Sequence, residues 1–433
     1  MKKTILTFAL TAFAAVAYAE ELTLDEALDF ALNRSPAAVA AEATYLSARA
    51  DLYQGWGGIM PNASVTYSAS RYYDRETLQF GGFEIPGYVP PDHYYYAEAR
   101  VDQPIFAGGR LIWGVLSGRA SGRAGNAGRD EQRQRLVVDV ARAYFGALKA
   151  TGLKEVADLS LEASRKNEEL ALAQYEADAI SRAEYLRAVV QRGSDEINAI
   201  SAEAAVETAR LAFFNTVGME PDPDLTFVPG DAPAPPGDLP SLDELIARAS
   251  RQRPDAVRIR EEKRIAELGV RSASGGWLPT LAASAAYDWS DYDSPSADTW
   301  DANDEWIVGI AASWSLFDGF QTKANVDRAR AAAIVARTAY DRLDDTVALD
   351  VTQAYYEYKK QAETVVVAKE TADAAREELL LVQELFALGG ASTLELTDAQ
   401  ALGVGALNSL VDAEYDFRVA EYDLKRALGE IEH

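Results

Sequence analysis

Two acidic residues lie three positions apart directly after a pair of glycines. Glu395 and Asp398 follow Gly389-Gly390, and Ser392 lies between the two pairs. Glycine tolerates the backbone of a tight turn, and serine is a favoured cap at a helix start. The pattern therefore predicts a helical hairpin whose returning helix carries both carboxylates on one face. The chemistry that such a pair can supply is electrostatic, namely the attraction of cations.

The chain shows no constellation of residues that would carry out covalent chemistry. It has no cysteine, and its only histidines are His93 and His433. The sequence contains no phosphate-binding loop, nucleophile elbow or cluster with metal-ligand spacing. We therefore expect no enzymatic activity, no cofactor and no resident metal. The formal net charge of −26 also argues against binding to nucleic acid, whose phosphates would be repelled.

The elements that must position the acidic pair occur twice, because the sequence is internally duplicated. At an offset of 218 residues, Leu24-Asp25-Glu26 matches Leu242-Asp243-Glu244, and Gly57-Gly58 matches Gly275-Gly276. From Phe106 onward the offset is 211. The later matches include Phe106 with Phe317, Asp139 with Asp350, Tyr144 with Tyr355, Ser181 with Ser392 and Gly218 with Gly429. The two repeats are predicted at 20–218 and 241–433.

The two copies differ at the acidic pair itself. In the first copy, Glu184 and Arg187 occupy the positions of Glu395 and Asp398, so only the second copy has two acids there. A proline-rich segment at 219–240 is predicted to link the copies.

Each copy is predicted to contain a helix, a β-hairpin, a very long helix and a return helix. All prolines lie at 36–104 or 221–295, and the proline-free tracts are rich in good helix formers. Apolar residues at alternating spacings of four and three predict coiled-coil packing for the long helices, at about 109–177 and 319–387. A helix of this length spans about 100 Å and needs other long helices beside it.

The β-hairpins are predicted at about 62–106 and 280–317, where apolar and polar residues alternate. An apolar face is common in soluble sandwiches, but two features favour a membrane. Trp306 and Trp314 lie eight residues apart, and with Tyr287 and Trp289 they could form aromatic girdles. The opposite face of one strand carries three charged residues, which suits a watery lumen; they are Glu98, Arg100 and Asp102. Four strands cannot close a barrel, so several chains would have to share one.

The first nineteen residues have the pattern of a secretory signal peptide. Two lysines precede an apolar run that ends in Ala17-Tyr18-Ala19. We expect cleavage there, and, because the chain has no cysteine, no lipid anchor on the mature protein.

With these residues in hand, the sequence resembles the TolC-family outer-membrane factors (outer membrane efflux proteins). The most specific segments are residues 103–110, QPIFAGGR, with their echo SLFDG at 315–319, and residues 386–399, FALGGASTLELTDA. Residues 22–28, LTLDEAL, are also typical. The resemblance implies a homotrimer with a twelve-stranded β-barrel in the outer membrane of a Gram-negative bacterium. Long helices would continue this barrel as an α-helical barrel in the periplasm.

The resemblance also implies a function and a set of partners. Such proteins are the exit channels of tripartite efflux or type I secretion systems, which combine a periplasmic adaptor with an inner-membrane pump. The exported substrate, whether drug, metal or protein, is not specified by these residues. The competing hypothesis is a soluble periplasmic coiled-coil or adaptor protein, which would share the signal and the heptads but not the amphipathic strands.

By resemblance, the second-copy hairpin lines the periplasmic pore entrance. The residues assigned to this entrance are Glu395, Asp398, Phe386, Gly389 and Gly390. In a trimer, six carboxylates would surround the axis, and their mutual repulsion is expected to raise their pKa values. Better-known members close the entrance with a tyrosine and an arginine, at positions that fall here on Phe386 and Ala391. We therefore expect a different closure.

Overall fold

A computed structural model describes residues 21–73, 79–80, 83–84, 91–230, 240–295, 304–388 and 390–431. The expected signal peptide and residues 231–239 of the proline-rich segment lie outside these ranges. The chain forms two compact units, each built from segments of both sequence copies. We call Met1–Ala41, Glu131–Arg253 and Val347–His433 the helical unit, and Glu42–Asp130 with Pro254–Thr346 the strand unit.

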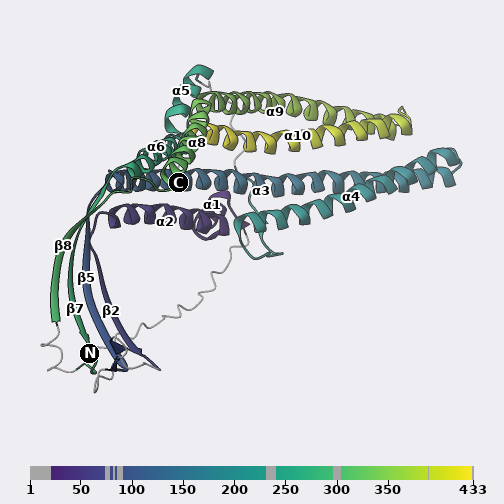
Figure 1. The fold of residues 1–433 in the computed structure, drawn as a ribbon. Coiled ribbons are helices and arrows are strands. Elements are labelled where there is room, and N and C mark those ends of the chain that lie inside the picture. The colour runs from purple at the N-terminus through teal and green to yellow at the C-terminus, as the bar shows by residue number, and fades with distance from the viewer. Residues whose placement is uncertain are drawn as a thin grey trace. The chain divides into compact units, whose positions relative to one another are not determined.

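The helical unit consists mainly of two long helical hairpins (Figure 1). The first is formed by α3 (Arg110–Glu176), from Glu131 onward, with α4 (Arg182–Val217). The second is formed by α9 (Leu343–Ala387), from Val347 onward, with α10 (Thr393–Leu428). The shorter elements of this unit are α1 (Leu24–Arg34), α5 (Leu242–Gln252), β1 (Glu21–Leu22) and β6 (Thr226–Phe227).

A buried tyrosine holds the parallel β1–β6 pair against the first hairpin. The Tyr144 hydroxyl lies 2.8 Å from the carbonyl oxygens of both Leu22 in β1 and Val228 directly after β6, so its one proton is shared between these two acceptors. Its ring packs edge-on against Phe213 and Phe227. Burial raises the pKa of Tyr144 to about 12, so the donor proton stays in place across the physiological range.

The structure corrects the expectation of one helix at the start of each copy, because each is broken by a proline. In the first copy α1 ends before Ser35, and α2 runs over Pro36–Gly57. In the second copy α5 ends before Arg253, and α6 runs over Pro254–Ser274. Proline cannot donate the helical hydrogen bond and disfavours helical torsions at the preceding residue. Ser35 and Arg253 accordingly have extended backbone torsions.

Each of these breaks lies against the end of a return helix in the helical unit. The C-caps of α4 and α10, Gly218 and Gly429, have φ angles of 80° and 74°, which favour glycine. A Cβ on Gly218 would lie 2.6 Å from Cδ of Pro36, and one on Gly429 would lie 3.1 Å from Cα of Arg253. In both copies, therefore, the C-cap glycine lies against the residue that precedes the proline, with a Cβ on Gly218 at 3.3 Å from Cα of Ser35.

The second-copy long helix is also not continuous, which corrects the helix expected at 319–387. It comprises α8 (Gln321–Asp341) and α9, separated at Arg342. Arg342 has torsions of −90° and −5°, and its N–H still bonds to Thr338, so the interruption is a local distortion with no chain reversal. Its first-copy counterpart, expected at 109–177, is the uninterrupted α3.

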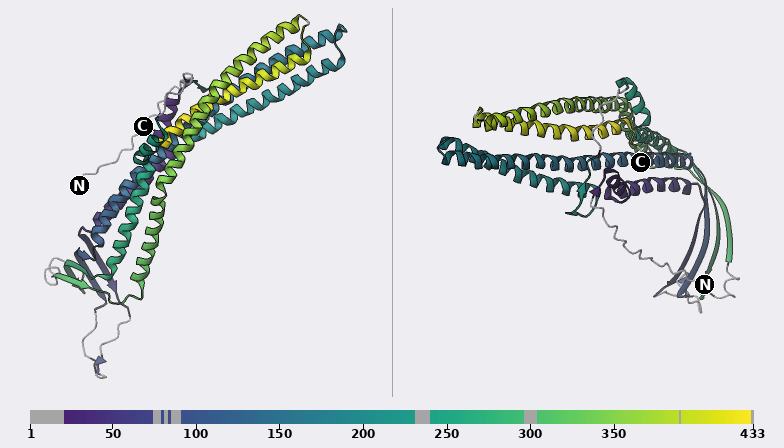
Figure 2. Two further views of the ribbon diagram at one scale, coloured as in Figure 1. Left: turned by 90° about the horizontal axis from the view of Figure 1, so that it is seen from above. Right: turned by 180° about the vertical axis from the view of Figure 1, so that it is seen from behind.

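The strand unit contains a four-stranded antiparallel sheet of β2 (Asn62–Arg71), β5 (His93–Ala107), β7 (Thr280–Asp291) and β8 (Asp304–Ser313) (Figures 1 and 2). The strand order is β2-β5-β7-β8, so β2 and β8 are its edges. The unit also contains α2 from Glu42, α3 up to Asp130, and α6 packed against α8. A turn of 3₁₀-helix at Gly275–Trp277 leads into β7, and a two-stranded ribbon pairs Gln79–Phe80 with Phe83–Glu84.

The strand register confirms that the apolar positions of all four strands share one face. Val65 is opposite Ala99, which is opposite Tyr287, which is opposite Trp306. The other face carries the polar row Thr66, Glu98, Asp288 and Glu305 in the same order. Arg100 donates to Asp102 at 2.8 Å on this face. Among the described residues, no helix is long and apolar enough to cross a membrane.

We expect Tyr144→Phe to weaken the attachment of the β1–β6 pair. The substitution removes a buried donor shared by two carbonyls, which should lower the free energy of unfolding by about 1–2 kcal/mol. Hydrogen exchange at residues 225–228 would measure this locally. Tyr415→Phe in the same core is the matched control, and equal effects of the two substitutions would contradict the role of the Tyr144 hydroxyl.

Candidate channel entrance

The tip of the second hairpin is a tight turn stabilised by backbone hydrogen bonds. The N–H of Leu388 donates to Glu384 at 3.2 Å, and the N–H of Gly390 donates to Leu385 at 2.8 Å. Gly389, assigned to the entrance from the sequence, lies outside the described residues. Helix α10 then begins after its N-cap Ser392.

Glu395 is held in a capping box at the start of α10. Its Oε2 accepts from the Ser392 N–H at 2.6 Å and from the Ser392 hydroxyl at 2.9 Å. In return, the Glu395 N–H donates to the Ser392 hydroxyl at 3.3 Å. The Ser-x-x-Glu spacing in the sequence is a known signal for this motif, and it indicates a capping role for Glu395 that the sequence-based expectations did not include.

The capping box changes the electrostatics expected for the acidic pair. Hydrogen bonds from the backbone and side chain of Ser392 lower the pKa of Glu395. Within the single chain these donors stabilise the charged form of Glu395. The expected increase in pKa depends on repulsion between chains in a trimer and stays a prediction. Asp398 lies one turn further along α10 and is exposed, without an ion-pair partner among the described residues. It is the freer carboxylate of the pair.

Phe386 is placed differently from the two acids. Its half-buried side chain lines a small cavity between the two helical hairpins of the helical unit. The cavity wall includes Ala171 and Gln174 of α3, Ala188 of α4 and Leu396 of α10. An apolar ring lies more favourably in such a wall than at an exposed tip.

The tip of the first hairpin repeats the same construction with different side chains. The N–H of Ala179 donates to Gln174 at 2.8 Å, as that of Gly390 does to Leu385. Asp178 has a positive φ of 56°, a conformation that aspartate tolerates better than most residues. The N–H of the N-cap Ser181 donates to Oε2 of Glu184 at 2.7 Å, and the hydrogen bonds from Ser181, followed by the charge of Arg187, lower the pKa of Glu184.

Polar contacts join the two hairpins along α3 and α10. Arg142 lies 3.1 Å from Asp423, and Lys149 lies 3.0 Å from Asp412 and 2.9 Å from Asp416. Closer to the tips, the Asn167 amide donates to Gln400 at 2.9 Å. These pairs were not among the sequence-based predictions. A signal was present in the basic residues seven apart on α3 and the acids at spacings of four and seven on α10.

The aromatic residues assigned to girdles do not all lie at the surface of the strand unit. Trp306 is 70% exposed and contacts Tyr287 at 5.1 Å between ring centroids. Trp314 is 60% exposed, and its Nε1 donates to the Trp277 carbonyl. Trp289 is fully buried in the single chain. It lies on the inner strand β7 opposite the small Ala97, so it does not contribute to an exposed girdle there.

The described residues contain no group of three or more histidine, cysteine, aspartate or glutamate side chains that could hold a metal ion.

Paired long helical hairpins in one unit, and a four-stranded sheet with a continuous apolar face in the other, define an outer-membrane channel fold. The outer membrane channel CmeC of Campylobacter jejuni has this fold, with a TM-score of 0.80, 15% identity, and coverage of 94% of this chain and 85% of that one.

The chain belongs to the outer membrane efflux protein family, whose model matches residues 27–219 and 245–430. It is thus an outer-membrane protein. It is 24% identical over 301 residues to the outer membrane efflux protein BepC of Brucella suis, covering 70% of this chain and 64% of BepC. It is 24% identical over 422 residues to the alkaline protease secretion protein AprF of Pseudomonas aeruginosa, covering 92% of this chain and 82% of AprF.

We expect the second hairpin tip to fray in acid through Glu395. The pKa of Glu395 is lowered in the folded state, so the charged cap stabilises the tip at pH values above the ordinary glutamate pKa of about 4.3. This stabilisation is lost as the pH falls through the lowered pKa. Hydrogen exchange at residues 393–397, corrected for intrinsic rates, should show protection falling below about pH 4. Glu395→Gln can cap without titrating, so its protection should stay level; an equal loss in this variant would contradict the assignment.

Proposed function

We propose that three copies of this chain form an exit channel through the outer membrane, fed from the periplasm. The observation that carries the proposal is the open sheet of the strand unit. It has one continuous apolar face, and its edge strands β2 and β8 have no partner strand among the described residues. An open edge is not tolerated in lipid, so the sheet requires further copies to close. Three copies would supply twelve strands.

In this proposal the apolar face contacts lipid and the polar face lines the channel. Trp306, Val308 and Ile310 on β8 are 70–78% exposed in the single chain, as expected of side chains that lipid would cover. Glu98, Arg100 and Asp102 would face the aqueous lumen. The first nineteen residues would serve as the secretory signal, and the proline-rich segment as the linker between copies.

The helical unit would form the periplasmic tunnel. Its apolar residues cannot all be covered within one chain: Val190, Ile197 and Ile200 on α4 are 65–71% exposed. Neighbouring copies would cover such residues. The efflux and protease-secretion names of the relatives support a periplasmic adaptor and an inner-membrane pump as partners. Because the match spans less than two thirds of BepC, we extend no substrate from it to this chain.

The entrance of the tunnel would carry Glu395 and Asp398 at the second hairpin tip. Six carboxylates around a threefold axis would favour cations by their summed field. The capping bonds of Glu395 oppose the repulsion among these groups, so we assign the larger part of the selectivity to Asp398.

The oligomeric state tests the shared barrel directly. Protein extracted in mild detergent should have three times the mass of the mature chain by light scattering. A monomer that retains its full β content would contradict the proposal.

Channel recordings in planar bilayers test the entrance. We expect Asp398→Asn to reduce cation selectivity more than Glu395→Gln, because the first removes the freer charge and the second keeps a cap. The double variant should be weakest. The matched control is Glu184→Gln at the first tip. Selectivity unchanged in the double variant would contradict a role for this pair.

A further inference from the structure

The offsets of the sequence duplication relate the strand register of one hairpin to that of the other. In the first hairpin Asn62 is opposite Asp102. The offset of 218 carries Asn62 to Thr280, and the offset of 211 carries Asp102 to Ser313. In the second hairpin Thr280 is indeed opposite Ser313. The two offsets therefore convert a strand pairing in one copy into the equivalent pairing in the other.

The two copies meet within the chain at β5 and β7, where two glycines are in close contact. Gly108, with a φ of +62°, lies against Gly275, and a Cβ on either residue would overlap the backbone carbonyl of the other. In the adjoining strands Asp102 is opposite Ser284. Glycine is thus required at both positions by the junction between the first copy and the second.

The counterparts of these glycines have no such contact. Gly319 corresponds to Gly108 and has a similar φ of +64°, and Gly57 corresponds to Gly275. A Cβ on either residue would meet nothing within 4 Å. Gly57 ends helix α2 without a positive φ, so nothing in the single chain requires glycine there.

The side chains around Gly319 are also uncovered. Phe317 is 74% exposed, whereas its counterpart Phe106, at the junction within the chain, is 41% exposed. The second copy therefore presents the same junction surface as the first, without the element that covers it.

We propose that β8 pairs with β2 of a second copy of this chain in the register of β5 with β7. Applying both offsets places Ser313 opposite Thr66 of the partner subunit and Ile310 opposite Ala69 of the partner subunit. Gly319 then lies on Gly57 of the partner subunit, as Gly108 lies on Gly275. The inference rests on the proposed shared barrel and specifies its joint.

This register agrees with the faces of the sheet. Ala312 falls opposite Tyr67 of the partner subunit, and both residues belong to the apolar positions. Ser313 and the partner's Thr66 belong to the polar positions. A shift by one residue would place polar side chains against lipid. The proposed joint keeps the apolar face continuous from chain to chain and leaves no edge unpaired.

Disulfide trapping tests the register, because the chain has no cysteine of its own. Ser313→Cys is combined in one chain with Thr66→Cys, Ser64→Cys or Ser68→Cys, all small residues on the same face. Only directly opposed residues bring Cα atoms within the roughly 7 Å that a disulfide spans. We expect the Ser313/Thr66 pair to give covalent trimers on oxidation in membranes, at several times the yield of the two shifted pairs.

The matched control is Asp102→Cys with Ser284→Cys, the equivalent pair within one chain. It should oxidise without forming covalent oligomers. Trimers trapped best through Ser64 or Ser68 would overturn the register and leave the shared barrel standing. No trapping by any pair, with an oxidised control and a monomeric mass, would overturn both.

The glycine contact is tested separately. Gly57→Ala should leave the single chain folded, since its Cβ meets nothing there, but should destabilise the trimer by overlap with the partner's Gly319. Gly58→Ala is the control, because its Cβ would make only an ordinary contact of 3.5 Å with Gly55. The trimer-to-monomer transition on heating in detergent should fall for Gly57→Ala alone, and equal transitions for the two variants would overturn the contact.

Discussion

The need to satisfy backbone hydrogen bonds at the two ends of the sheet governs the rest of this structure. β2 and β8 each offer one edge that no described strand of the same chain covers. In lipid, an unpaired N–H or carbonyl costs several kcal/mol, and a strand edge presents one at every second residue. Four strands are too few to curl back on themselves. The proposed shared barrel would pair both edges and remove this cost.

Much of the architecture could be predicted from the sequence because its signals are local. Alternation in Ala63 to Ala69 and Trp306 to Ala312 indicated strands and their apolar face. Seven-residue patterns indicated the long helices. The contacts between elements had weaker signals. The charge spacings on α3 and α10 suggest ion pairs but do not say which residues meet: Lys149 and Asp416, for example, are separated by 267 residues. The break at Arg342 lacks proline or glycine, so nothing local announced it.

The candidate entrance shows that one carboxylate can have two roles at the same helix end. The hairpin and its cap were predictable from Gly390 and Ser392. The role of Glu395 was not understood, because the same carboxylate can either face a pore or close a helix end. Its three contacts with Ser392 favour the second role in the single chain.

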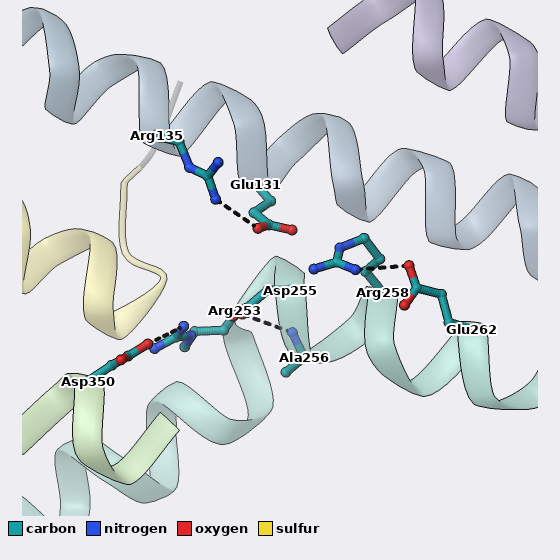
Figure 3. Close-up of polar contacts among 8 residues, drawn as sticks. All are labelled: Glu131, Arg135, Arg253, Asp255, Ala256, Arg258, Glu262 and Asp350. Carbon is teal, nitrogen blue, oxygen red and sulfur yellow. Dashed lines mark hydrogen bonds and ion pairs between the residues drawn. The ribbon is translucent and has the colours of Figure 1, made fainter. Parts of the chain in front are cut away.

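The two copies differ at the charged residues beside the helix breaks. Arg253, at the break in the second copy, is 6% exposed and lies 3.0 Å from Asp350 on α9 (Figure 3). The first copy has Ser35 in place of Arg253, and its Asp139 instead approaches Arg142 at 3.7 Å.

The strand pairing, in contrast, is equivalent in the two copies. The seven-residue difference between copies falls between β2 and β5, and neither hairpin register has changed. The segment between β2 and β5 can therefore change in length without altering the sheet. An insertion within a strand would instead shift its register against the strands on both sides.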